Sequence, residues 1–234
     1  MKLSVQNLNS HYGPAHILFD IALEVGEGEV VALLGRNGAG KSTTFRSIVG
    51  LVAQRTGRIT FEGRDVSSRP THEIVRSGLG YVPEERRIFT DLSVEENLEV
   101  GRQPKRPNAP YWTREKLFSL FPNLGEMRHR AGGRMSGGEQ QMLTIARTLM
   151  GNPHLVLLDE PSEGVAPVIV EQLARMIVAL KAEGLSILLS EQNLQFARLV
   201  ADRALVLEKG QVRFADSMHA LMADDAAQRA WLSV

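Results

Sequence analysis

The sequence feature that most constrains the fold of this chain is a glycine-rich loop over residues 35–42, which reads Gly-Arg-Asn-Gly-Ala-Gly-Lys-Ser. Its spacing matches the phosphate-binding pattern G-x-x-x-x-G-K-[ST]. A short apolar run at 29–34 precedes the loop and predicts a strand buried on both faces, and a helix is expected over 41–49. The flanking strand and helix disfavour the alternative of a glycine-rich turn that matches the pattern by chance.

Backbone N–H groups and a helix N-terminus in such a loop compensate the negative charges of a triphosphate. We expect Lys41 to reach the β- and γ-phosphates and Ser42 to bind Mg²⁺. The residues predicted to line the nucleotide are Gly35, Arg36, Asn37, Gly38, Ala39, Gly40, Lys41, Ser42 and Thr43.

A second candidate site lies at the end of the apolar run 155–158, where Asp159 and Glu160 follow directly. Ligands of open α/β sheets sit at the carboxyl ends of the strands, beside a loop of this kind. Asp159 is expected to hold Mg²⁺ through water, and Glu160 to polarise the attacking water as a general base. The alternative is that the two acids lie at a solvated strand end and have no function. The neighbouring phosphate loop disfavours this alternative.

The order of elements predicts an α/β fold. Alternating apolar residues indicate strands at 2–8 and 17–25, which form an N-terminal antiparallel part, and later strands alternate with helices, which is typical of a mostly parallel sheet. The interval from about 90 to 150 is mostly helical and interrupts the alternation. We therefore expect one domain, 1–234, with a helical subdomain inserted in a P-loop NTPase core.

The remaining elements follow from periodicity and capping residues. Thr71 is expected to cap a helix over 71–77, Ser93 and Glu96 form a predicted capping box, and an irregular loop is expected over 101–112. Further strands are predicted at 58–61, 79–82, 186–189, 203–207 and 211–214, and further helices at 93–100, 113–121, 137–150, 167–182 and from Met218 onward.

Composition excludes several classes of function. Lys plus Arg and Asp plus Glu both number 27, and this zero net charge argues against a general nucleic-acid binder. There are no cysteines, so thiolate catalysis and cysteine-bound zinc are excluded. No stretch of about 20 apolar residues exists, and the N-terminus is unlike a signal peptide. We expect a cytosolic chain whose membrane role comes through a partner.

Between the two sites, residues 135–140 read Met-Ser-Gly-Gly-Glu-Gln at the start of a predicted helix. With this segment, the chain resembles the ATP-binding cassette (ABC) family over essentially its whole length, because the segment is similar to the family signature LSGGQ. The resemblance implies ATP and Mg²⁺ as ligands, ATP hydrolysis, and a head-to-tail dimer. In that dimer Ser136, Gly137, Gly138 and Glu139 of one subunit contact the γ-phosphate held by the other.

The resemblance also implies a role for Tyr12, which matches the adenine-stacking aromatic of the family. The alternative is that Tyr12 is a residue at the edge of the hydrophobic core and does not bind adenine. Three positions depart from the common pattern: Glu84 stands where glutamine is usual, Gln192 where histidine is usual, and Ala166 where aspartate is usual. Glu84 is expected at the metal, and Gln192 beside the attacking water.

The segments 81–89, 92–98, 136–142, 163–167 and 191–193 are similar to the ATPases of branched-chain amino-acid importers. That resemblance implies permease subunits, a second ABC subunit of the same or a different chain, and indirectly a solute-binding protein. It also implies a position at the cytoplasmic face of the cell membrane. Importers of urea, amides or aromatic acids, exporters, soluble ABC proteins and P-loop kinases are the alternatives. Gln192 and Glu84 together favour the hypothesis that this chain works beside a different cassette that retains histidine.

Overall fold

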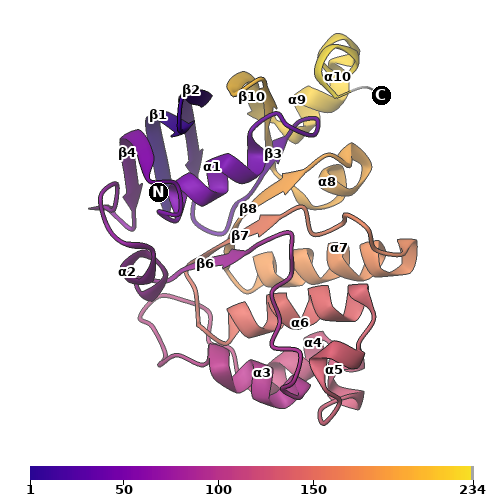
Figure 1. Ribbon diagram of the computed structural model, residues 1–234. Helices are drawn as coiled ribbons and strands as arrows, with labels where there is room; N and C mark the ends of the chain where they lie inside the picture. Colours follow the sequence, from indigo (N-terminus) through magenta and orange to yellow (C-terminus); the bar gives the residue numbers. More distant parts are fainter. Residues whose placement is uncertain (233–234) are drawn as a thin grey trace.

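The computed structural model describes residues 1–232 and arranges them around two β-sheets (Figure 1). The ten strands of these residues are β1 (Leu3–Tyr12), β2 (Ala15–Val25), β3 (Val30–Leu34), β4 (Gln54–Phe61), β5 (Arg64–Asp65), β6 (Leu79–Val82), β7 (Leu155–Asp159), β8 (Ser186–Glu191), β9 (Arg203–Glu208) and β10 (Gln211–Ser217). The final two residues of the predicted domain, 233–234, lie outside the described residues.

The helices lie between these strands in sequence, and the last two, α9 and α10, follow the final strand. They are α1 (Lys41–Ile48), α2 (Thr71–Arg76), α3 (Val94–Gly101), α4 (Arg114–Leu120), α5 (Pro122–Glu126), the 3₁₀ helix η1 (Gly132–Arg134), α6 (Gly137–Leu149), α7 (Pro167–Ala182), α8 (Leu194–Val200), α9 (Met218–Ala223) and α10 (Asp225–Trp231). No helix within residues 1–232 combines the length and the apolar character that a membrane crossing requires.

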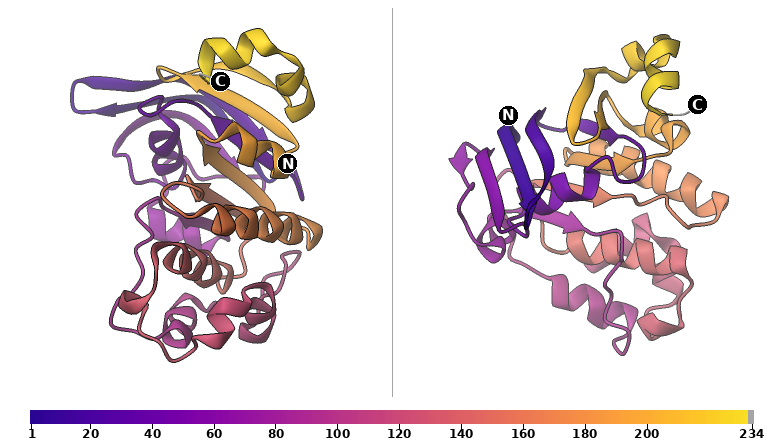
Figure 2. Two further views of the ribbon diagram at one scale, coloured as in Figure 1. Left: turned by 90° about the vertical axis from the view of Figure 1, so that its right-hand side faces the viewer. Right: turned by 45° about the horizontal axis from the view of Figure 1, so that its top comes forward.

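The two sheets differ in direction. The first is antiparallel and has the order β2-β1-β4-β5; the second has the order β10-β9-β3-β8-β7-β6 and is parallel except for β10. Figure 2 shows the antiparallel strands at one side of the molecule and α3–α6 at its lower end. This architecture confirms the predicted α/β class, with its mostly parallel sheet and antiparallel N-terminal part.

Strand β3 is buried on both faces because successive side chains point to opposite sides of the sheet. Val31 and Leu33 pack with Phe45 of α1 and with the antiparallel sheet. Their neighbour Val30 belongs to the cluster formed with α6 and α7, and Leu34 packs with residues of α8–α10. The apolar run at 29–34 is thus explained by its central position.

The carboxyl ends of three parallel strands meet at one edge of the sheet. Leu34 of β3 is paired with Glu191 of β8, and Asp159 of β7 with Ser190 of β8. The loops that follow β3, β7 and β8 therefore begin side by side, although the end of β3 is more than a hundred residues from the other two in sequence. This register places the phosphate loop beside both carboxylates.

All the predicted strands are present, and most are longer than predicted. The prediction that Thr71 caps its helix is wrong: Pro70 is the capping residue, because its carbonyl already accepts hydrogen bonds from the N–H groups of Glu73 and Ile74. Helices α5 and α8 were not predicted. The expected C-terminal helix is divided at Asp224, whose carboxylate accepts a hydrogen bond from Ala227 N at 2.8 Å and caps α10.

The capping box of α3 is confirmed, with the Ser93 hydroxyl and the Glu96 carboxylate each accepting from the other's backbone N–H. One turn on, Asn97 is fully buried and fixes the preceding loop. Its side-chain Oδ1 accepts from Phe89 N at 3.0 Å, and its Nδ2 donates to the carbonyls of Phe89, Leu92 and Ser93 at 2.9–3.1 Å.

Replacing Asn97 with alanine should destabilise the protein by about 2 kcal/mol, because the N–H of Phe89 loses its partner inside the protein. Equilibrium unfolding in urea measures this change. The matched control is Glu99→Ala, an exposed position on the same helix, where we expect a change within about 0.5 kcal/mol. Equal stability of the two variants would contradict this role for Asn97.

Candidate functional site

The phosphate loop connects β3 to α1 and has backbone conformations that require glycine. Gly38 and Gly40 have φ values of 78° and 111°, and Gly40 is the N-cap residue that precedes α1. A Cβ atom at Gly40 would lie 2.8 Å from Cδ2 of Leu18, so the close packing of the loop on β2 also excludes a side chain. Gly210, which lies between β9 and β10, also fixes the phosphate loop, because its N–H donates a hydrogen bond to the carbonyl of Ala39 at 2.8 Å.

Lys41 lies almost completely buried at the centre of this loop. Its ammonium donates to the carbonyl oxygens of Gly35 at 2.7 Å and Arg36 at 3.1 Å, and it pairs with Oε1 of Glu160 at 3.1 Å. A buried charge needs such partners, and here they close the loop around the ammonium. The phosphate loop and the second carboxylate site are therefore joined by a direct ion pair.

Asp159 accepts three hydroxyl hydrogen bonds. Ser42 and Ser190 donate to Oδ1 at 3.1 and 2.6 Å, and Tyr81 donates to Oδ2 at 3.2 Å. Burial raises the pKa of the Asp159 carboxyl, and these three donors offset part of that increase. Ser42 and Asp159, both predicted as metal ligands, are thus in contact, and their oxygen atoms are the kind that Mg²⁺ prefers.

Glu160 is 7% exposed and has a left-handed backbone with φ 46°. Its N–H donates to Ser190 Oγ at 3.1 Å, and its Oε2 accepts from Nε2 of Gln192 at 3.0 Å. Burial alone would raise the pKa of Glu160, but hydrogen bonds with Glu163 and Gln192 and the charge of Lys41 outweigh it, so the pKa lies below its usual range. Glu160 is therefore charged at neutral pH in this arrangement.

Two further glutamates surround this carboxylate. The hydrogen bond with Glu160 raises the pKa of Glu163 to about 7. Glu84 lies in the loop after β6, and burial together with the charges of Glu160 and Asp159 raises its pKa. The charges of Asp159 and Glu160 therefore act on Glu84, but among residues 1–232 no group of three or more acidic or histidine side chains is arranged to hold a metal ion, so the expected metal contact of Glu84 stays a prediction.

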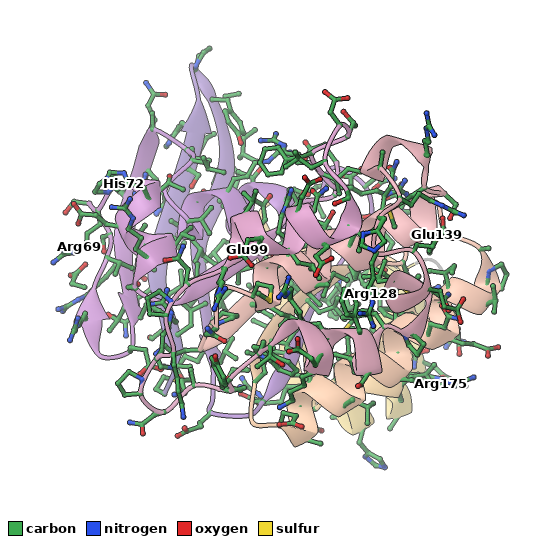
Figure 3. The ribbon with its side chains drawn as sticks, turned by 90° about the horizontal axis from the view of Figure 1, so that it is seen from below. Arg69, His72, Glu99, Arg128, Glu139 and Arg175 are labelled. Carbon is green, nitrogen blue, oxygen red and sulfur yellow. The ribbon has the colours of Figure 1, made fainter. Side chains whose placement is uncertain are left out.

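The remaining predicted residues lie apart from this cluster. Tyr12, at the end of β1, is 47% exposed. The signature residues begin α6, where Ser136 Oγ accepts from Glu139 N at 3.4 Å and Ser136 N donates to Glu139 Oε2 at 2.7 Å. Figure 3 shows Glu139 at the edge of the molecule. Within residues 1–232, no hydrogen bond or ion pair joins residues 135–140 to the phosphate loop.

Sequence reasoning missed the residues that support the predicted ones. Ser190 and Tyr81 both hold Asp159, and Glu191 accepts from Ser162 N at 3.0 Å and Asn193 N at 3.3 Å. Glu191 therefore ties the loop after β7 to the loop after β8. The sequence placed these residues near the ends of predicted strands, and Tyr81 and Glu191 in importer-like segments, but neither signal indicated their hydrogen-bond partners.

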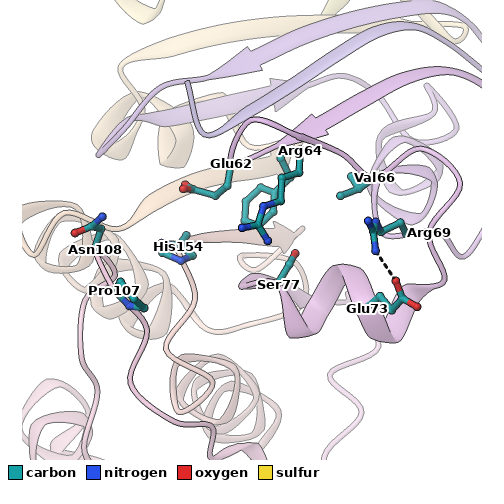
Figure 4. A pocket seen from close by; sticks show the side chains of 10 residues that line it. Glu62, Arg64, Val66, Arg69, Glu73, Ser77, Pro107, Asn108 and His154 are labelled. Atoms are coloured by element: carbon teal, nitrogen blue, oxygen red, sulfur yellow. Dashed lines mark hydrogen bonds and ion pairs between the residues drawn. The ribbon is translucent and has the colours of Figure 1, made fainter.

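A pocket of about 330 Å³ lies away from these motifs, between the β4–β5 hairpin, α2 and the segment around Asn108 (Figure 4). An Arg69–Glu73 ion pair of 2.9 Å forms one wall, and His154 lies opposite. A hollow of similar volume is lined by Gly35, Arg36, Asn37, Gln192 and Leu232. Only this second hollow is in contact with the phosphate loop.

Comparison with known proteins agrees with the geometry. The profile of the ABC transporter family matches residues 18–163. The high-affinity branched-chain amino acid transport ATP-binding protein BraG of Pseudomonas aeruginosa is 42% identical over 230 residues, which is 98% of this chain and 99% of BraG. The lipopolysaccharide export system ATP-binding protein LptB of Haemophilus influenzae is 37% identical over 98% of this chain and 96% of LptB.

A solved structure described as an ATP binding subunit of an ABC transporter superposes with a TM-score of 0.83 and 29% identity, covering all of this chain and 97% of the other. The chain therefore belongs to the ABC transporter family. It is an ATPase of that family, which binds and hydrolyses ATP.

Replacing Gln192 with histidine should raise ATP turnover, because an imidazole beside Glu160 can exchange a proton that an amide cannot. It should also add an acidic limb to the pH–rate profile near pH 6.5, the usual pKa of histidine. Steady-state ATPase assays from pH 5.5 to 9 measure both changes. Gln192→Asn is the control, since it keeps the amide and shortens the side chain.

An unchanged rate and pH profile in the histidine variant would mean that glutamine substitutes adequately at this position. That result would also remove the reason to expect a different cassette as partner.

Proposed function

We propose that this chain powers solute uptake as the ATP-hydrolysing subunit of a membrane importer for branched-chain or related amino acids. The observation that carries the proposal is the contact of Lys41 and Ser42 with the two carboxylates at the end of β7. The amino-acid substrate is supported by the higher identity to BraG than to LptB and by the importer-like segments of the sequence.

In this proposal, ATP lies along the phosphate loop, residues 35–43, with its adenine on the exposed ring of Tyr12. The backbone N–H groups at the start of α1 and the Lys41 ammonium face the phosphates. Bound phosphate would compete with Glu160 for Lys41. Nucleotide binding therefore releases the general base from the ion pair that holds it in the free protein.

The hydroxyl of Ser42 and the carboxylate of Asp159 are the proposed holders of Mg²⁺, with Glu84 as an additional oxygen donor. When it is bound there, Mg²⁺ would supply positive charge to the phosphate oxygens of ATP. These residues fit a hard cation because all are oxygen donors and because burial raises the pKa values of Asp159 and Glu84, so their charged forms would be stabilised by a bound cation.

Glu160 then removes a proton from the water that attacks the γ-phosphorus. A bond forms between the water oxygen and phosphorus, and the bond to the bridging oxygen breaks, so that ADP leaves with the electron pair. Gln192, hydrogen-bonded to Glu160, holds this water or the phosphate as a neutral donor. The residues Glu160 and Gln192 thus carry the catalytic roles.

Within residues 1–232, no hydrogen bond or ion pair joins the signature residues to the phosphate loop, so we do not assign them to their own subunit's nucleotide. We assign them to the γ-phosphate held by a second ABC subunit in a head-to-tail dimer. Ser136 and the N–H groups of Gly137, Gly138 and Glu139 at the start of α6 offer donors and a positive helix end. ATP binding would close the dimer, and hydrolysis would reopen it.

A groove of about 420 Å³ supports docking of a permease. It lies between the β6 side of the core and the helical interval, and its walls include Tyr81, Phe89, Val100 and Arg147. Phe89 and Val100 are 47% and 53% exposed and line the same groove, and neighbouring exposed apolar side chains form a surface that a partner can cover. We place the chain at the cytoplasmic face of the membrane through this contact, with a solute-binding protein outside.

An exporter ATPase is the second candidate, since the identity to LptB is 37% over nearly the full length. It would use the same ATP site and a different permease. Importers of urea, amides or aromatic acids are a third, for which the same groove and site would serve.

Transport by the purified complex tests the proposal. The tagged chain is isolated from membranes with the subunits that co-purify and is reconstituted in liposomes with ATP in the lumen. We expect uptake of labelled leucine, isoleucine or valine, at least tenfold above that of urea or benzoate, after addition of the solute-binding protein. Lys41→Ala in the same complex should abolish uptake, because the phosphate charge loses its main counterion.

Uptake of urea, an amide or benzoate alone would overturn the amino-acid assignment and keep the importer. Extraction of a labelled lipid from the liposomes, without uptake, would instead identify an exporter.

A further inference from the structure

The loop that follows β6 carries an arginine pair, Arg86 and Arg87, and is bound to the signature helix α6. The carbonyl of Arg86 accepts a hydrogen bond from Thr144 Oγ1 at 2.8 Å, and the carbonyl of Arg87 accepts from Arg147 Nη2 at 2.7 Å. Both arginines have left-handed backbones, with φ values of 63° and 50°. The loop thus has a fixed position on α6, and strained backbone of this kind is concentrated at functional sites.

The Arg86 guanidinium lies over the first turn of α6. A Cβ atom added to Gly137 would be 2.5 Å from Nη1 of Arg86, and one added to Gly164 would be 3.9 Å from its Nη2. Arg86 therefore fills the space that a side chain at the signature glycine would need. It also borders the loop that carries Glu160 and Glu163.

No ion pair or side-chain hydrogen bond joins the Arg86 guanidinium to another residue in the range 1–232. The carboxylate of the adjacent Glu85 pairs instead with two other arginines, Arg46 at 2.9 Å and Arg87 at 3.7 Å. A free cation beside a helix N-terminus is electrostatically unfavourable, because the helix end is itself positive. The arrangement becomes favourable when an anion approaches this surface.

We propose that Arg86 is a further catalytic residue, which contacts the γ-phosphate of the ATP held by the partner subunit. This inference rests on the head-to-tail dimer of the proposed function, which brings that phosphate to the signature helix. A guanidinium presents several N–H donors in a plane and stabilises the charge that spreads over the phosphoryl oxygens in the transition state. The proton and the leaving ADP follow the route through Glu160 given above.

This role also accounts for the charge balance of the site. Gln192 replaces a side chain that can be positive, and Glu84 adds a negative one near the same phosphate. Arg86 of the opposite subunit places a positive charge beside that phosphate and so compensates both changes. The closed dimer then has a cation on each side of the γ-phosphate, Lys41 from one subunit and Arg86 from the other.

Arg86→Ala should lower kcat for ATP by about 10- to 100-fold, because a charge-assisted hydrogen bond of the transition state is lost. Binding of a fluorescent ATP analogue to the isolated subunit should stay unchanged. Arg86→Lys keeps the charge and loses the planar donors, so we expect an intermediate rate. Arg87→Ala is the matched control, since it removes a neighbouring arginine of similar backbone conformation; its kcat should equal that of the wild type.

Mixed dimers test the action across the interface. A mixture of Arg86→Ala and Lys41→Ala subunits gives dimers with one intact site and one doubly damaged site, so turnover above that of either variant alone is expected. If Arg86 acted on its own subunit's ATP, both sites of the mixed dimer would be damaged and no turnover would return.

Wild-type turnover in Arg86→Ala, or no recovery in mixed dimers that are shown to form, would overturn the proposal for Arg86. A wild-type chain that neither hydrolyses ATP nor dimerises with it would instead overturn the proposed function. The two failures are therefore distinguishable in one experiment.

Discussion

The buried ammonium of Lys41 is the interaction on which the rest of the site depends. It holds the carbonyls of Gly35 and Arg36 and the carboxylate of Glu160 within 3.1 Å, so one charge orders the loop and restrains the residue that we propose as the general base. Phosphate is the natural competitor for that ammonium, because it brings more negative charge than one carboxylate. In the proposed mechanism, nucleotide binding and the release of Glu160 are coupled through this single ion pair.

The parallel sheet makes this coupling possible. Strands β3, β7 and β8 deliver the phosphate loop, Asp159 with Glu160, and Glu191 with Gln192 to one edge, in a register fixed by backbone hydrogen bonds. Glu191 then ties two of these loops together. The signature helix lies elsewhere on the chain, and this separation is the physical reason to expect that a second subunit completes the site.

Local signals allowed much of this to be predicted. The phosphate loop, the acids after 155–158 and the capping box at Ser93 depend on neighbours in the sequence, and each is found where expected. The contacts of Asp159 with Tyr81 and Ser190 depend on strand order, which no local pattern contains. Helix α8 has only seven residues, too few for a clear period, and the position of Arg86 over Gly137 arises from a loop folding onto a distant helix.

The measurement that tests the central claim most directly uses Glu160→Gln, which keeps the size of the side chain and removes its charge. Sedimentation with MgATP, together with the steady-state ATPase rate, should show a stable dimer with ATP trapped in it and turnover reduced by about 10²- to 10⁴-fold. Wild-type turnover, or a monomer at saturating ATP, would contradict the account, because Glu160 would then be neither the base nor the residue whose chemistry reopens the dimer.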